Sequence, residues 1–291
     1  MTEKTKRRRR LFLPLFIPFL LVILLLYAFS ETLQVVRYTV ESDKLTAPIR
    51  LVLLTDLHSC YYGDEQKDLI RAIEKQKPDF ICLAGDIFDD KTPHRGTMAL
   101  LDGIADAYPC YYVTGNHEHW SEEVTVLNAL LASYGVTVLA GDTVQYTSGG
   151  QTVTISGIDD PTGFHDMGIY GLPDPETWYG QLALAEEAVS GSPHFSLLLS
   201  HRPEKTEEYK NSSFDLVLSG HAHGGQIRIP FLMNGLFAPN QGYFPEYAGG
   251  RYTLGNTTLI VSRGLCKNDL PRVFNRPELV VIDLQPKAPE S

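Results

Sequence analysis

Five short runs of mostly apolar residues recur along the chain, and each run ends at a polar segment. Short apolar runs bounded by Gly and polar residues are typical of strands in a sheet that is covered on both faces. The runs occupy residues 50–54, 80–84, 111–113, 195–199 and 216–218. They predict the buried strands of a sheet-based domain.

Segments with other periodicities separate these runs. Residues 66–77 predict a helix, because Leu69, Ile70 and Ile73 share one face and Pro78 ends the pattern. Similar patterns predict helices over 96–107, 122–134 and 178–189. Further strands are expected over 33–40, 143–146, 152–156, 251–253, 258–261 and 279–284. This order predicts an α/β fold, a layered β-sandwich of two mixed sheets flanked by helices.

The polar segments after the five runs carry acids, an amide and imidazoles, which are costly to bury without partners. Taken singly, each segment is more often a capped turn than a metal site. Together they form a mixed oxygen and imidazole set that suits Mn, Fe, Zn, Co or Ni, and the absence of cysteine from the set argues against a structural zinc site. The candidate ligands are Asp56, His58, Asp86, Asn116, His201, His221 and His223.

The N-terminal end has a different pattern. Residues 11–29 carry no charge and follow Arg7 to Arg10, which predicts a single-pass membrane anchor with residues 1–10 in the cytoplasm and the body outside it. A cleaved signal ending near Ala28-Phe29-Ser30 is the alternative. A linker with a first strand follows over 30–48, then one domain over 49–285 and a tail over 286–291.

Charge and cysteine content narrow the function. Beyond residue 30 the chain has 19 basic and 34 acidic residues, a balance that repels nucleic acid. The four cysteines lack metal-ribbon spacing, and their number is too small for a disulfide framework in 291 residues. Cys82 and Cys110 are predicted core residues, whereas Cys60 follows His58 and is interpreted as a bystander near the metal site.

The polar segments, in order, resemble the five signature motifs of calcineurin-like metallophosphoesterases. The resemblance spans about residues 49–284 and implies the fold of that family. The motif that begins at Gly220 and extends to Gln226 is further similar to a membrane-linked bacterial branch that acts on envelope or phospholipid-type phosphoesters. The matching segments are Asp56-x-His58, Gly85-Asp86-x-x-Asp89, Gly115-Asn116-His117-Glu118, His201 and Gly220-His221-x-His223.

The resemblance implies roles for these residues. Two divalent cations (Mn, Fe, Zn or a mixed pair) would share Asp86 as a bridge. Asp56, His58 and His223 would hold the first, and Asn116, His201 and His221 the second. The implied reaction is phosphoester hydrolysis by a hydroxide that bridges the metals.

The resemblance also assigns His117 to catalysis, as a group that stabilises the transition state or protonates the leaving group. Asp89 would orient His117, although an N-cap of the following segment is the alternative. Glu118 receives no role. Asp90 stands where protein phosphatases carry a phosphate-binding arginine, so that branch is not expected; Arg95, Arg202 or Arg263 could substitute.

The predicted function is a membrane-anchored, manganese-favouring hydrolase, with phosphodiesters preferred over monoesters. The alternatives are a non-catalytic metal-binding scaffold and a cleaved, exported phosphomonoesterase. The loops over 159–177 and 231–250 are rich in Gly, Pro and aromatic residues, and the second could grip a lipid or nucleobase.

Overall fold

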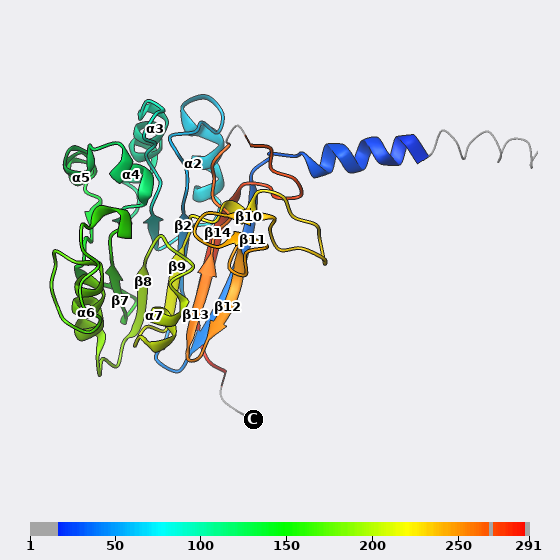
Figure 1. Cartoon of the computed structure of the whole chain (residues 1–291). Helices are drawn as coiled ribbons and strands as arrows, with labels where there is room; N and C mark the ends of the chain where they lie inside the picture. Colours follow the sequence, from blue (N-terminus) through cyan, green and yellow to red (C-terminus); the bar gives the residue numbers. More distant parts are fainter. Residues whose placement is uncertain (1–16, 268–269, 289–291) are drawn as a thin grey trace, which may run out of the picture.

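Two six-stranded mixed sheets face each other, and helices cover the outer face of each (Figure 1). The computed structural model describes residues 17–267 and 270–288. This arrangement confirms the predicted layered α/β fold with two mixed sheets.

The first sheet has the strand order β1-β14-β2-β3-β4-β5. Strands β2 to β5 run parallel to one another, and β14 pairs antiparallel with β2. Its strands are β1 (Gln34–Ser42), β2 (Ile49–Leu54), β3 (Phe80–Ala84), β4 (Cys110–Val113), β5 (Thr137–Val138) and β14 (Glu278–Pro286). The helices on its outer side are α2 (Lys67–Glu74), α3 (Arg95–Ile104) and α5 (Val124–Ser133).

The second sheet has the order β12-β13-β9-β8-β7-β6, with β7, β8, β9 and β13 parallel. Its strands are β6 (Thr143–Ser148), β7 (Gln151–Gly157), β8 (Phe195–Leu199), β9 (Leu216–Ser219), β12 (Gly250–Leu254) and β13 (Thr257–Val261). The predicted hairpin is β6–β7. Helices α6 (Trp178–Val189) and α7 (Thr206–Asn211) accompany this sheet, and the apolar layer on its outer side includes Trp178 and Tyr209.

Alternate residues of each strand face different apolar layers, which explains the continuous apolar runs in the sequence. In β2, Leu51 and Leu53 point between the sheets, whereas Val52 and Leu54 point toward the outer helices. All four are fully buried. The core between the sheets therefore holds the strand ends of both sheets in fixed positions.

Several short elements were not predicted. Helix α4 (Asn116–Trp120) begins directly after the turn that follows β4. Its residues are mostly polar, so no helical apolar period identifies it. The others are the strand β5 and the helix α7 named above, the two-stranded β10 (Phe237–Ala238) and β11 (Gly242–Tyr243), and the 3₁₀ turns η1 (Asp64–Gln66), η2 (Pro161–Gly163) and η3 (His223–Gly225).

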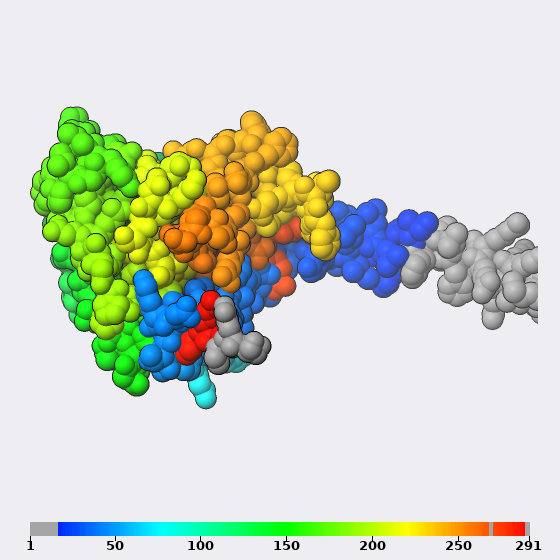
Figure 2. All heavy atoms as spheres, turned by 90° about the horizontal axis from the view of Figure 1, so that it is seen from below, coloured from blue at the N-terminus to red at the C-terminus, as the bar shows by residue number. Residues whose placement is uncertain are grey.

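The N-terminal part of the description is a helical segment over residues 17–28 that projects from the body (Figures 1 and 2). Its apolar side chains are exposed up to Tyr27, whose ring packs against Phe274 at a centroid distance of 6.1 Å. The predicted span begins at residue 11, and residues 11–16 lie outside the described residues. Within the described residues, no helix is both long and apolar enough to cross a membrane.

Candidate metal centre

The seven candidate ligands come from five strand ends that meet at one edge of the sandwich. Asp56 and His58 follow β2, Asp86 follows β3, and Asn116 opens α4 after β4. From the second sheet, His201 follows β8, and His221 and His223 follow β9. Because these strands are parallel neighbours within each sheet, their carboxyl ends converge on one place.

Acidic and imidazole side chains form two clusters that share Asp86. In the first, Asp56, His58, Asp86 and His223 each offer one donor atom, and these atoms lie within 4.8 Å of one another. In the second, Asp86, His201 and His221 do the same. Asn116 adjoins both, because the backbone N–H of the next residue donates to Asp86 Oδ1 at 2.8 Å.

Each of the seven side chains keeps one buried polar atom without a hydrogen-bond partner among the described residues, apart from the 3.1 Å approach of His201 Nε2 to Asp86 Oδ2. Leaving so many buried donors and acceptors unpaired would cost several kcal/mol in total unless another group satisfied them. Carboxylate, amide and imidazole atoms directed at one place fit divalent cations. The atoms are Asp56 Oδ2, His58 Nε2, Asp86 Oδ2, Asn116 Oδ1, His201 Nε2, His221 Nδ1 and His223 Nδ1.

The backbone at this edge is unusual. Five of the seven residues have φ values between 45° and 65°, in the left-handed region that non-glycine residues rarely adopt. Such conformations cluster at functional sites because the surrounding structure must hold them in place. The five are Asp56, His58, Asp86, His221 and His223.

Hydrogen bonds to the second ring nitrogen orient three of the imidazoles. His58 Nδ1 lies 3.1 Å from Asp89 Oδ2, and His201 Nδ1 lies 2.9 Å from the carbonyl oxygen of Ala84. His221 Nε2 lies 2.9 Å from Asn240 Oδ1. Donation by Nδ1 of His58 and of His201 leaves the opposite nitrogen of each ring as an acceptor, which is the form that binds a metal. For His221 the Nε2 atom also faces the donor Arg202 Nη1 at 2.9 Å, so Asn240 alone does not set its tautomer.

The carboxylates draw positive charge to this edge. Burial by itself lowers the pKa of His201, but Asp86 outweighs burial and raises that pKa to about 10. The two side chains approach to 3.1 Å between Nε2 and Oδ2. For His58, burial is outweighed by the hydrogen bond to Asp89 and the charge of Asp86, so its pKa rises to about 9. A divalent cation would be attracted by the same carboxylates.

His117 faces a neighbouring cavity of about 370 Å³ that His58 and His223 also line. The resemblance assigned Asp89 to orienting His117, and the structure places Asp90 closer to this imidazole. His117 Nδ1 lies 2.7 Å from Asp90 Oδ1 but 3.6 Å from Asp89 Oδ2. Asp89 is engaged elsewhere, since Oδ2 bonds to His58 and Oδ1 accepts the backbone N–H groups of the two residues that follow Asp90.

Glu118, to which the sequence analysis gave no role, shapes the backbone around the site. Its fully buried carboxylate accepts the backbone N–H groups of Asp86, Ile87, Phe88 and Gly115 at 2.8–3.0 Å. These bonds tie α4 to the loop after β3. The sequence feature that could have indicated a role for Glu118 is its position as the last residue of the Gly115–Glu118 motif.

Of the three arginines considered as substitutes, the structure brings Arg202 next to the candidate ligands. Arg202 is buried and pairs with Asp160 through two hydrogen bonds, and its Nη1 lies 2.9 Å from His221 Nε2. Arg263 instead pairs with Glu278, and Arg95 is exposed at the start of α3. Arg202 is therefore held by Asp160 beside the candidate ligands.

Comparisons with known proteins agree with this geometry. The family model described as "Calcineurin-like phosphoesterase" matches residues 49–225. The uncharacterised metallophosphoesterase YkuE of Bacillus subtilis is 29% identical over 89% of this chain and 88% of its own length. The phosphodiesterase YaeI of Escherichia coli is 28% identical over 82% of this chain and 83% of its own. A bovine transmembrane protein with a metallophosphoesterase domain is 29% identical over 81% of this chain and 53% of its own.

Proposed function

The chain belongs to the calcineurin-like phosphoesterase family, and on this premise we propose that it is a membrane-associated hydrolase of phosphodiesters that uses two divalent metal ions. Family membership supports the coarser part of the proposal, a metal-dependent phosphoester hydrolase. The observation that carries it is the set of seven buried, unpartnered donor atoms arranged around Asp86.

In this proposal Asp56, His58 and His223 hold the first ion, and Asn116, His201 and His221 hold the second. Asp86 contacts both, as its membership of both clusters supports. When bound, the two ions supply Lewis-acid stabilisation of the phosphoryl group and acidify water. The protein residues fix the positions of these donors, since their strand ends are anchored in the core.

His117 acts on the substrate side. It lies on the cavity wall rather than among the seven donors, and Asp90 binds its Nδ1. With Nδ1 held, Nε2 is the nitrogen that can give a proton to a departing alkoxide or stabilise charge on the phosphoryl group. Lys91 and Lys267 line the same cavity and offset part of the negative charge of Asp89 and Asp90.

A diester preference and a lipid or envelope-type substrate rest on two observations. The E. coli relative carries the name phosphodiesterase. The loop around Phe231 and Leu232 exposes both apolar side chains and, with Phe274, lines a second cavity. Phe274 also packs on Tyr27, so this loop and the apolar helical segment share one region of the surface. We expect manganese to support activity best.

Membrane attachment and an extracytoplasmic body are also part of the proposal. The exposed apolar side chains of residues 17–27 support attachment, since a run of such residues is costly to leave in water. The arginine run before them supports a cytoplasmic N-terminus.

The test is a matrix of metals and substrates applied to the full chain and to Asp86→Asn. We expect wild-type protein to bind two ions and to hydrolyse a bis-nitrophenyl phosphodiester, with Mn²⁺ most effective. Asp86→Asn should lose bound metal and roughly 100-fold or more of the activity, because both ions depend on this carboxylate. Asp106→Asn, an exposed acid on the body, is the matched control and should behave as wild type.

Two results would count against the proposal. A protein that binds two ions but hydrolyses no mono- or diester would be a scaffold of the same fold. Activity confined to monoesters would agree with a phosphoester hydrolase but contradict the proposed preference for diesters.

A further inference from the structure

We propose that Cys266 supplies a sulfur donor to the ion held by Asp56, His58 and His223, so that the two metal positions differ in chemistry. This inference rests on the proposed function. None of the seven ligands expected from the sequence is a cysteine, and nothing in the spacing of the cysteines indicates this position.

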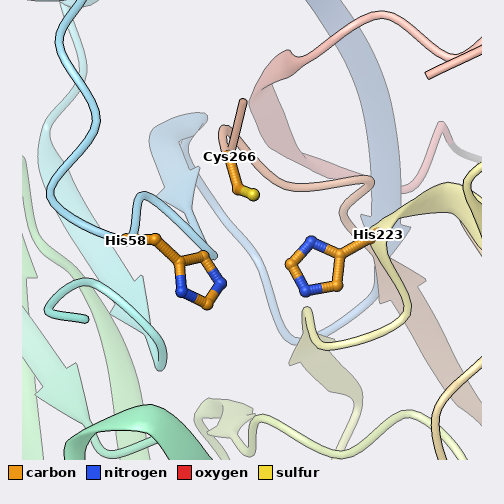
Figure 3. A group of neighbouring side chains, drawn as sticks. All are labelled: His58, His223 and Cys266. Carbon is orange, nitrogen blue, oxygen red and sulfur yellow. The ribbon is translucent and has the colours of Figure 1, made fainter. Parts of the chain in front are cut away.

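The geometry begins with three side chains that point toward one another (Figure 3). The sulfur of Cys266 and one nitrogen each of His58 and His223 lie within 4.8 Å of one another. Donors bound to one Zn²⁺ at about 2.0–2.3 Å are separated by no more than about 4.6 Å, so small side-chain adjustments close this set around an ion. Cys266 is only 3% exposed.

The imidazoles provide an independent sign that a ligand belongs here. His58 Nε2 and His223 Nδ1 are buried and have no hydrogen-bond partner among the described residues. The same two histidines belong to the cluster with Asp56 and Asp86. Among the described residues the sulfur groups with these two histidines, with neither carboxylate, and with neither His201 nor His221. The proposed bond therefore places the ion on the Cys266 side of the two imidazoles.

The loop that carries Cys266 is tied to the loop that carries Asp56. The backbone N–H of Leu265 donates to the carbonyl of Thr55 at 3.1 Å. Gly264 has φ +74°, and a Cβ at this position would approach Asp56 Cβ to 2.7 Å. Only glycine allows this close contact, which brings the following cysteine to the metal position.

Cys60 lies near Cys266 and serves as the comparison thiol. The backbone N–H of Lys267 donates to the Cys60 sulfur at 3.5 Å. Cys60 and Cys266 both line the cavity beside His117. Among the described residues, Cys60 belongs to none of the groups of candidate metal ligands.

Binding requires no oxidant. The Cys266 thiol loses its proton to solvent as the sulfur–metal bond forms, and the metal keeps its oxidation state. A thiolate with two imidazoles favours Zn²⁺, Fe²⁺ or Co²⁺ over Mn²⁺, whereas the amide, carboxylate and imidazole set of the second position accepts Mn²⁺. The expected active form is a mixed pair in which Mn²⁺ occupies the second position.

The experiment uses the full chain, kept reduced and loaded with Zn²⁺ and Mn²⁺ or with Co²⁺. X-ray absorption at the zinc edge of the wild-type protein should contain a sulfur shell at about 2.3 Å. The Co²⁺ form should have a near-ultraviolet sulfur-to-cobalt charge-transfer band. Cys266→Ser should lose both signals, and Cys60→Ser, the matched control, should keep them.

The outcomes separate this inference from the proposed function. Two bound ions without a sulfur shell would overturn the role of Cys266 and leave the hydrolase intact. Loss of the band in Cys60→Ser but not in Cys266→Ser would also overturn it. Failure of the wild-type protein to bind any divalent ion would remove both proposals. The wild-type zinc-edge measurement decides the matter even if Cys266→Ser does not fold.

Discussion

Glu118 illustrates how one side chain holds the local backbone of the centre. Its carboxylate has no contact with solvent and accepts four backbone N–H groups, two of them from Asp86 and Ile87. Asp86 itself has a left-handed φ of 52°, and its own carboxylate belongs to both clusters. A conformation of this kind persists only where surrounding contacts compensate for its cost.

Glu118→Ala should therefore lower the free energy of unfolding by about 3 kcal/mol or more, because four buried backbone donors lose their acceptor. Urea unfolding of metal-free protein at neutral pH measures this change. Glu74→Ala, at an exposed position near the end of α2, is the control and should stay within about 0.5 kcal/mol of wild type. Equal effects of the two substitutions would show that the buried carboxylate has no special role.

Asp89 and Asp90 should have separable effects, because Asp89 binds His58 while Asp90 binds His117. Asp90→Asn is expected to lower kcat about 10- to 100-fold and change its pH profile, with metal content unchanged. Asp89→Asn is expected to weaken metal binding at the first position, so that added metal restores activity. Steady-state kinetics with metal analysis distinguishes them, and the reverse pattern would contradict the assignment.

At the scale of elements, strand ends from both sheets are joined by side-chain pairs. Asp160 follows β7 and caps η2, accepting the backbone N–H of Thr162 at 2.9 Å. Arg202 follows His201 after β8 and binds both oxygens of Asp160. This pair holds the loop beside His221, so it positions one candidate ligand.

Asp160→Asn should cost about 3 kcal/mol of stability at pH 7, because the buried Arg202 would lose its hydrogen-bonded carboxylate and keep only Glu204, 3.7 Å from its Nη1. Burial raises the pKa of Asp160, but the hydrogen bond and charge of Arg202 outweigh burial and hold it below its usual range. A lowered acid pKa stabilises the fold above the unfolded value of about 3.9, and this contribution disappears as pH falls through the folded value.

The difference between wild type and Asp160→Asn should therefore shrink as pH falls below about 4. Urea midpoints at pH 7 and pH 3 measure it. Lys44→Gln, which removes an exposed partner of Asp215, is the control and should change stability by less than about 1 kcal/mol. A difference that stays constant with pH would exclude the ion pair as its source.

On the scale of the whole molecule, apolar surface gathers on one side. The helical segment over residues 17–28 leaves the body near Phe274, close to the cavity lined by Phe231 and Leu232 (Figure 2). The rest of the chain carries an excess of acidic residues.

The full chain should sediment with vesicles of phosphatidylcholine and phosphatidylglycerol. Leu21→Arg with Leu24→Arg should reduce the bound fraction at least about tenfold, because two exposed apolar side chains no longer enter the bilayer. Val126→Arg alters an exposed apolar residue of α5 and serves as the control. Binding that survives the paired substitution would argue against this segment as the attachment.

The sequence by itself determined the two sheets and the identity of the seven candidate ligands. Apolar runs such as 80–84 and 195–199 coincide with β3 and β8, because strands buried on both faces need apolar residues at every position. The end of a buried strand restricts where the next residues can lie. The positions of Asp86 and His201 at the sheet edge could therefore be predicted from their neighbours in sequence.

Tertiary structure alone decided which side chains meet across loops. It paired His117 with Asp90, bound Arg202 to Asp160, and brought Cys266 to His58, from which it is separated by most of the domain. These contacts depend on distances of a few ångströms between loops, such as the approach of Gly264 to Asp56. Local propensity carries no information about such distances, because the packing of both sheets sets them.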